Sequence, residues 1–315
     1  MSVDTCLPAT AALSRAEPDR TRLLGAAAAL FTVVLWAAGM VATRFGVTGS
    51  LSLYDVVFLR LVLPALLLLP LLWRSARAEA FRGISRPVLA VLAIGAGVPF
   101  MLVSSAGMVF APAAHAGALM PGVMPLFAAL LALLLLGERF NAARKAGILL
   151  MLLGAVAVGG HQVVNGTTGA WRGDLLFITA GAMWASYTIA MKKSGLTAWQ
   201  AVALIYVSSF ILYAPVYLLW LDSRLPAAPV SEIAVQLVQS VASGLLSMAA
   251  YGFAVRRLGA AGAAAFGALT PALTALMAIP LLGEWPDTAT WSGIAAVSFG
   301  VALANGVFAR RPRPA

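Results

Sequence analysis

The chain has 315 residues, of which 62% are hydrophobic and 10% are charged, and its formal net charge is +10. Soluble domains contain about half apolar and about a quarter charged residues, so this composition excludes a soluble protein and predicts a polytopic membrane protein. The only cysteine, Cys6, excludes an internal disulfide framework and a cysteine-rich metal site.

Apolar runs of about 20 residues are long enough to cross a bilayer as α-helices, and the chain contains ten of them. The expected fold class is therefore all-α. The ten spans are expected near residues 23–43, 53–73, 87–108, 113–136, 145–162, 174–191, 198–220, 233–255, 260–282 and 289–308. Residues 1–22 lack the apolar core of a cleavable signal peptide and are expected to form a disordered cytoplasmic tail. Residues 309–315 are expected to form a second one.

Lysine and arginine residues alternate between the two sides of the predicted spans. Counted over tails and loops, 17 fall on one side and 3 on the other, and Arg60 lies inside a span. Because basic residues stay on the cytoplasmic side, both termini are expected in the cytoplasm and the chain in a bacterial inner membrane. The basic residues lie between spans instead of forming one patch, so the expected partner is the lipid bilayer and not nucleic acid.

The sequence contains an internal repeat. A shift of 146 residues places Pro125 on Pro271, and a shift of 148 places Trp36 on Trp184. The first shift also aligns Leu136-Gly137-Glu138 with Leu282-Gly283-Glu284, Gly147 with Gly293 and Gly154 with Gly300. The repeats are expected at 23–162 and 173–308, with an external linker at 163–172. Each would hold five spans, an odd number, so the second would enter the membrane from the opposite side as an inverted repeat.

Prolines inside the fourth and ninth predicted spans are the second signal. Proline lacks a backbone N–H and clashes with the carbonyl four residues before it, so these helices are expected to be kinked or broken. Paired broken helices in two halves are typical of a transport site, although prolines are also common in membrane helices generally. The expected hinge positions are Gly117, Pro121, Pro125, Gly267 and Pro271.

These repeated features resemble the EamA family of the drug/metabolite transporter superfamily, and most closely its bacterial aromatic-amino-acid exporter branch. The resemblance covers residues 25–306 and implies a carrier of small metabolites; the position of Arg60 is similar to that of an arginine common in the second helix of the family. The halves differ, because Glu284-Trp285-Pro286-Asp287 replaces Glu138-Arg139-Phe140-Asn141 and the seventh span has Tyr206 or a neighbour where the second has Arg60.

Two polar residues inside the predicted spans are candidates for substrate contact. An arginine near the middle of a membrane helix costs roughly 2.5–3.5 kcal/mol on insertion scales, and Arg60 could bind a substrate carboxylate. The alternative is a structural role, in which Arg60 bonds carbonyls freed at the proline breaks or reaches Asp55. His115 could titrate near physiological pH, or it could be a histidine hydrogen-bonded near the membrane interface.

Aromatic residues within the spans are candidates for lining a mostly apolar pocket. Trp36, Trp184 and Tyr251 could stack on a planar or amphipathic substrate, and Ser104 could add a polar contact. The alternative for aromatic residues at span ends is interfacial anchoring. The full set of expected substrate-binding residues is Trp36, Arg60, Ser104, His115, Trp184, Tyr187 and Tyr251.

The sequence shows no nucleotide-binding loop and no metal-binding motif, so we expect no ATP hydrolysis, no cofactor and no enzyme activity. The acidic residues fall in tails, in loops or at span ends, which favours facilitative transport. The predicted function is export of small metabolites, such as aromatic or other bulky neutral amino acids, by a monomeric carrier with alternating access. The alternatives are a drug or other-metabolite carrier, possibly proton-coupled through His115, and an intramembrane lipid-modifying enzyme, for which no catalytic set was found.

Overall fold

A computed structural model of the protein describes residues 9–136, 141–165 and 169–305. Within these ranges the chain forms helices and no β-strand, which confirms the predicted all-α class. The α-helices are α1 Ala9–Thr48, α2 Leu53–Arg77, α3 Arg86–Ala96, α4 Val98–Phe110, α5 Ala113–Leu136, α6 Ala142–Asn165, α7 Trp171–Ser194, α8 Ala198–Trp220, α9 Val230–Val241, α10 Ser247–Ala265, α11 Thr270–Leu282 and α12 Thr288–Ala304. Three short segments complete the set, the 3₁₀ helices Leu225–Ala227 and Phe266–Leu269 and the π-helix Ala242–Leu246.

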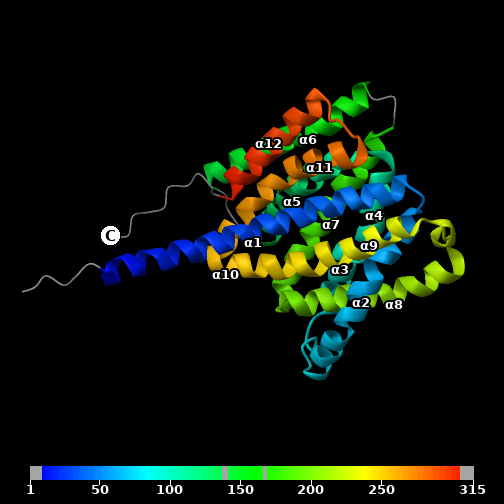
Figure 1. Cartoon of the computed structure of the whole chain (residues 1–315), viewed down its shortest axis with the longest axis horizontal. Helices are drawn as coiled ribbons and strands as arrows, with labels where there is room; N and C mark the ends of the chain where they lie inside the picture. The colour runs from blue at the N-terminus through cyan, green and yellow to red at the C-terminus, as the bar shows by residue number, and fades with distance from the viewer. Residues whose placement is uncertain (1–8, 137–140, 166–168, 306–315) are drawn as a thin grey trace, which may run out of the picture.

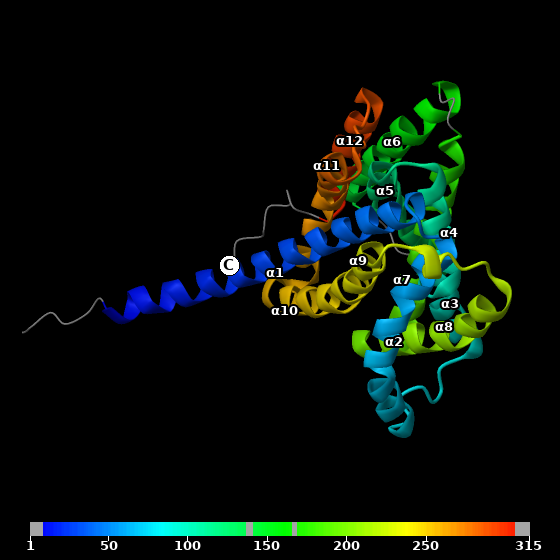
Figure 2. The same cartoon turned by 45° about the vertical axis from the view of Figure 1, so that its right-hand side comes forward.

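Eight described helical segments are long and apolar enough to cross a membrane, and two shorter apolar helices cover Ala113–Ala128 and Thr288–Ala304. The ten-span count and the cytoplasmic termini remain predictions. Helix α1 runs through the molecule with α10 along one side and α5 and α11 along the other, and its first turns project beyond the bundle (Figures 1 and 2). Helix α1 thus contacts elements of both repeats.

The third predicted span is interrupted at Gly97, which separates α3 from α4. The residue adopts φ −87° and ψ −153°, and a Cβ atom there would lie 2.2 Å from the carbonyl oxygen of Ala93. No side chain fits in that position, so glycine is required. The Ser209 hydroxyl of α8 accepts a hydrogen bond from the freed N–H of Val98 at 3.3 Å. A neighbouring helix therefore satisfies the broken backbone, as the absence of water in a membrane demands.

In the second half, Gly259 lies between two membrane spans, and the ninth predicted span contains a 3₁₀ segment at the predicted hinge residue Gly267. Helix α9 passes through the π-helix Ala242–Leu246 into α10, and Gly259 reverses the chain with φ 78°, a conformation favoured by glycine. A 3₁₀ segment then precedes α11, so Pro271 lies in the first turn of a helix, where proline is tolerated. In the first half, by contrast, α5 continues as one helix through Pro121 and Pro125.

Repeat-related glycines join α6 to α12, which lie side by side in Figure 1. A Cβ atom on Gly147 would be 2.7 Å from the Gly300 carbonyl oxygen, and one on Gly154 would be 2.8 Å from that of Gly293. Residue numbers rise along α6 as they fall along α12, so the two helices are antiparallel. Small residues let membrane helices approach this closely.

Candidate functional site

Arg60 projects from α2 toward α1. Its Nη1 donates a hydrogen bond to the Thr43 hydroxyl at 3.0 Å, and Thr43 is fully buried and donates its own proton to the Gly39 carbonyl. No acidic side chain in the described ranges forms an ion pair with Arg60. The two structural roles considered for this arginine are also not seen there, because its described partner is neither Asp55 nor a backbone carbonyl.

Tyr206 of α8 lies within electrostatic reach of the Arg60 guanidinium. Both side chains are surrounded by protein atoms, yet each keeps part of its accessible surface. Tyr206 was not among the predicted binding residues, although the repeat contained the signal, because a shift of 146 residues moves position 60 onto position 206.

The predicted aromatic residues form two groups instead of one. On α7, the ring centroid of Trp184 lies 5.1 Å from those of both Phe100 and Tyr187. On α1, Trp36 lies 5.6 Å from Tyr251 of α10. No ring contact joins the two groups among the residues that the structure covers. The expectation that Trp36, Trp184 and Tyr251 contact one substrate stays a prediction.

Several polar side chains lie near Trp36. Trp36 Nε1 donates to the Ser247 hydroxyl at 3.2 Å, and Gln239 Nε2 donates to the Ser243 hydroxyl at 2.7 Å. The Oε1 atom of Gln239 is buried and has no hydrogen-bond partner among the described residues. These residues flank the π-helix that joins α9 to α10, and π-helices are frequent at functional sites. Tyr206 also reaches this segment, because its hydroxyl would lie 2.7 Å from a Cβ on Gly244.

Ser104 and the predicted hinge residues have mainly packing contacts. The Ser104 hydroxyl donates to the Met101 carbonyl of its own helix at 3.1 Å and is buried. A Cβ on Gly117 would lie 2.6 Å from Thr274 of α11, so this glycine permits α5 and α11 to cross closely. A Cβ on Gly267, in contrast, would meet nothing within 4 Å.

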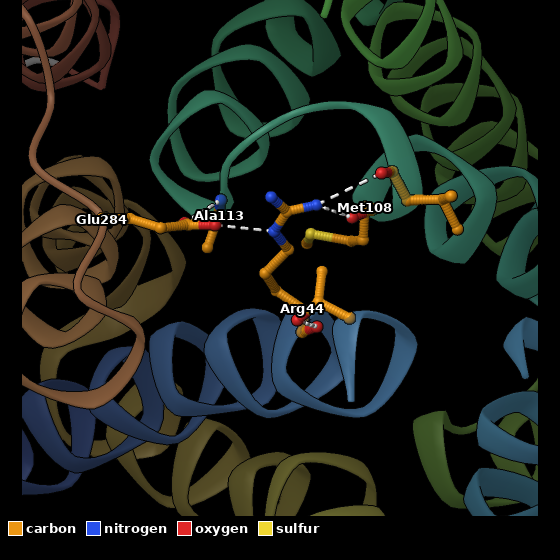
Figure 3. A network of polar contacts seen from close by, with 6 residues as sticks. Arg44, Met108, Ala113 and Glu284 are labelled. Carbon is orange, nitrogen blue, oxygen red and sulfur yellow. Dashed lines mark hydrogen bonds and ion pairs between the residues drawn. The ribbon is translucent and has the colours of Figure 1, made fainter. Parts of the chain in front are cut away.

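Arg44 and Glu284 connect the end of α1 to the segment after α11 (Figure 3). Arg44 Nε lies 2.6 Å from Glu284 Oε1, and its Nη1 donates to the carbonyl oxygens of Met108 and Val109 at the end of α4. The second oxygen of Glu284 accepts the Ala113 N–H at 2.8 Å and so caps α5. We call this set the Arg44–Glu284 latch.

Asp55, at the start of α2, is fully buried and accepts five hydrogen bonds. Its Oδ1 accepts from Tyr217 at 2.6 Å and from Ser223 at 3.0 Å. Its Oδ2 accepts from the backbone and hydroxyl of Ser52 at 2.8 and 2.7 Å and from the Arg224 N–H at 3.1 Å. Both oxygens of this carboxylate therefore accept hydrogen bonds, as expected of a buried acidic side chain with a structural role.

His115 has a buried acidic partner that the sequence pattern did not reveal. Its Nδ1 lies 2.7 Å from Asp174 Oδ1, and its Nε2 lies 3.4 Å from the Thr290 hydroxyl. The prediction placed Asp174 at a span end, where it does lie, in the first turn of α7. It did not anticipate that the residue is only 3% exposed.

A cavity of about 380 Å³ lies between α1 and α9. It is lined by Leu35, Ala38, Ala42, Ala234, Val235, Val238, Gln239 and Ala242. None of the predicted binding residues lines it, and its apolar wall is suited to lipid tails. Within the described ranges no three histidine, cysteine or acidic residues are grouped to hold a metal ion.

Comparison with known proteins places this geometry in a family. The model of the EamA-like transporter family matches residues 23–160 and again 171–306. A protein of Streptantibioticus cattleyicolor named "Probable terminal-alkyne amino-acid exporter" is 30% identical over 295 residues, which cover 88% of this chain and 92% of the relative. A crystal structure described only as that of a protein superposes with a TM-score of 0.59 at 20% identity, over 91% of this chain and 96% of the other.

The two family matches together span most of the chain, and the related exporter is matched over nearly its full length. The apolar helices and the family indicate a multi-pass protein of the bacterial inner membrane and a transporter rather than an enzyme. The crystal structure supports the fold alone. The chain belongs to the EamA-like transporter family.

Proposed function

We propose that this protein exports amino acids with bulky neutral side chains, aromatic ones included, by alternating access and without ATP. The observation that carries the proposal is Arg60, a guanidinium inside the membrane span of α2 that has no acidic partner among the described residues. A buried cation without a counter-ion is costly, and a substrate carboxylate would supply the missing charge through charge-assisted hydrogen bonds. The amino-acid cargo named for the 30%-identical relative supports the same substrate class.

The surroundings of Arg60 suit the rest of such a substrate. Tyr206 contributes a hydroxyl next to the guanidinium, and it packs against the same apolar cluster as Trp184 and the buried Phe100. Aromatic rings bind planar or bulky apolar groups by stacking and edge contacts. On the other side of Tyr206, the unpaired Oε1 of Gln239 is an acceptor of the kind that an amino group requires.

The two halves are proposed to be an inverted repeat with the substrate site between them. Arg60 and Tyr206 occupy equivalent repeat positions and lie near each other. Gly25 approaches Arg257 with a hypothetical Cβ distance of 2.8 Å, and the equivalent Gly173 approaches Ala111 at 2.5 Å. This contact in one half thus has a counterpart in the other, which supports a two-fold relation between the halves.

The test is uptake of labelled phenylalanine by proteoliposomes that contain this protein alone, compared with uptake of phenethylamine, which lacks the carboxylate. One or two charge-assisted hydrogen bonds of about 1.5–3 kcal/mol in total correspond to about 10- to 150-fold in affinity. Arg60→Gln should raise the KM for phenylalanine by that factor, and Tyr206→Phe by a smaller one. The matched control is Arg224→Gln, which changes an exposed arginine.

An unchanged KM for phenylalanine in folded Arg60→Gln protein would remove Arg60 from the site. If the wild-type protein moved no amino acid of a full panel, the drug or other-metabolite alternative would replace amino-acid export. Arg60→Lys keeps the charge and loses the fork geometry, so it should fall between wild type and Arg60→Gln. Gel filtration in detergent checks that each variant is folded.

A further inference from the structure

His115, Asp174 and Thr290 meet inside the bundle from three helices, α5, α7 and α12. The exposed fractions of the three residues are 2%, 3% and 2%. The imidazole lies between the carboxylate, 2.7 Å from Nδ1, and the Thr290 hydroxyl, 3.4 Å from Nε2. The other carboxylate oxygen, Asp174 Oδ2, is buried and has no hydrogen-bond partner among the described residues.

The charged groups around this set are few. On α5, the latch places Glu284 and Arg44 at the Ala113 N–H, two residues before His115. On α12, the Asp287 carboxylate caps the helix by accepting the Thr290 N–H at 2.7 Å. On α6, Gly159 faces Asp174 without a charge, with a hypothetical Cβ at 3.8 Å from Oδ2.

On α7 itself, Arg172 is exposed two residues before Asp174 and lies over the Trp171 ring, 5.6 Å from its centroid. No lysine or arginine side chain in the described part of the chain forms an ion pair with Asp174. The imidazole is therefore the group that balances this carboxylate.

The charge of the pair fixes how many protons it must carry. It is neutral only when it holds one transferable proton, either as imidazolium with carboxylate or as neutral imidazole with carboxylic acid. Removing that proton leaves a net negative charge in a site shielded from water, which costs several kcal/mol. Proton release is therefore linked to a rearrangement that admits water.

We propose that His115 and Asp174 form a binding site for one exchangeable proton, and that the occupancy of this site controls the opening of the transporter. The pair joins α5 of the first repeat to α7 of the second, so separation of the halves at this end would pull its partners apart and hydrate both. A proton would pass from water to the pair on one side and return to water after the conformational change. The inference rests on the proposed transport function.

The proposal explains how a carrier can respond to protons without a carboxylate in the middle of a span. The positions of the acidic residues along the sequence favoured facilitative transport, because each lies in a tail, in a loop or near a span end. In the folded chain, however, Asp174 is as inaccessible to water as a mid-span residue. Asp174 is shielded from water by the helices packed around it, although it lies near the end of its span.

The first experiment needs no substrate and follows opening by thiol labelling. A Ser105→Cys probe in a Cys6→Ser background places a thiol at a fully buried hydroxyl that has no hydrogen-bond partner in the described structure. Its labelling by a membrane-impermeant maleimide is measured from about pH 5 to pH 8, the range of histidine titration. The rate is divided by that of Thr48→Cys, an exposed position, to remove the titration of the thiol itself.

The normalised rate should change about fivefold or more across this range in the parent protein. His115→Gln and Asp174→Asn should each make it flat. The matched control His161→Gln changes the other histidine of the chain and should keep the response. A flat rate in the parent, or a pH response unchanged in both variants, would overturn the proposal.

The second experiment connects the site to transport. Phenylalanine efflux from proteoliposomes containing a trapped pH indicator, at clamped membrane potential, should acidify the lumen in the parent. In the two pair variants the luminal acidification per phenylalanine molecule exported should fall at least about tenfold. Phenylalanine flux without proton flow would refute coupling, whereas absence of all phenylalanine flux would count against the proposed substrate and leave the labelling result to decide on the proton site.

Discussion

Glu284→Gln is the substitution that tests the Arg44–Glu284 latch most directly. Glutamine keeps an oxygen that can cap the Ala113 N–H, now 2.8 Å from Glu284. It loses the negative charge that faces Arg44 Nε at 2.6 Å. The variant therefore removes the ionic part of the latch and leaves its capping part in place.

The size of the effect follows from these two bonds. Both side chains are largely shielded, with 16% and 17% of their surface exposed. Replacing a charge-assisted hydrogen bond by a neutral one costs about 1–1.5 kcal/mol, which is about 5- to 12-fold in the equilibrium between closed and open forms. Glu284→Ala also removes the cap, worth about 0.5–2 kcal/mol, and should shift the same equilibrium by about 100-fold.

The assay is again the labelling rate of the Ser105→Cys probe, which lies one turn inside the carbonyls of Met108 and Val109 that bind Arg44. Impermeant maleimide added to intact cells should label the probe faster in Glu284→Gln than in the parent, and faster still in Glu284→Ala. If the N-terminus is cytoplasmic, the end of α1 that carries Arg44 lies outside the cell. Because the reagent reacts only from outside, the same experiment tests this location of the latch.

A charge swap separates a latch from a simple ion pair. In the double variant Arg44→Glu with Glu284→Arg, the attraction is restored, but arginine has no acceptor for the Ala113 N–H and glutamate has no donor for the α4 carbonyls. Labelling should stay close to that of Glu284→Ala. Labelling restored to the parental rate, or unchanged in both single Glu284 variants, would refute the reasoning.

Two further predictions concern stability and are read from thermal unfolding in detergent. Gly154→Ala puts a methyl group 2.8 Å from the Gly293 carbonyl oxygen and should destabilise the protein by about 1–3 kcal/mol through overpacking. The control Gly160→Ala, whose Cβ would be 3.6 Å from its nearest neighbour, should leave the stability nearly unchanged. Equal effects of the two substitutions would contradict the close contact of α6 and α12. Asp55→Asn replaces one accepting oxygen by an amide NH₂ that faces hydrogen-bond donors, so it should lower the free energy of unfolding by about 2–4 kcal/mol. Asp222→Asn, at an exposed site, should change it little. An Asp55→Asn protein as stable as the parent would show that the network is dispensable.

The positions of the helix interruptions differ in part from those that the prolines predicted. Proline signals breaks because of its own geometry, yet α5 remains one helix through Pro121 and Pro125. The third span is instead interrupted at Gly97, where Ser209 of a neighbouring helix accepts the freed N–H of Val98, and the ninth contains a 3₁₀ segment at Gly267. Glycine is so frequent in membrane helices that its sequence position alone does not distinguish a break from a close contact.

The sequence by itself determined the helical class, the apolar spans, the duplication and the family. These properties are local or additive, because a bilayer requires about 20 apolar residues for each span and a repeat is visible by shifting the chain along itself. Even the relation between Arg60 and Tyr206 was present as a shift of 146 residues.

Only the tertiary structure decided which polar groups meet. His115 and Asp174 are 59 residues apart, and Arg44 and Glu284 are 240 apart. Each pairing depends on how far a helix is rotated about its axis and how closely it approaches its neighbour. Between α5 and α7, for example, the close approach depends on Gly181, where a Cβ would lie 2.3 Å from Val123 Cγ2. No property of a single helix contains such a fit.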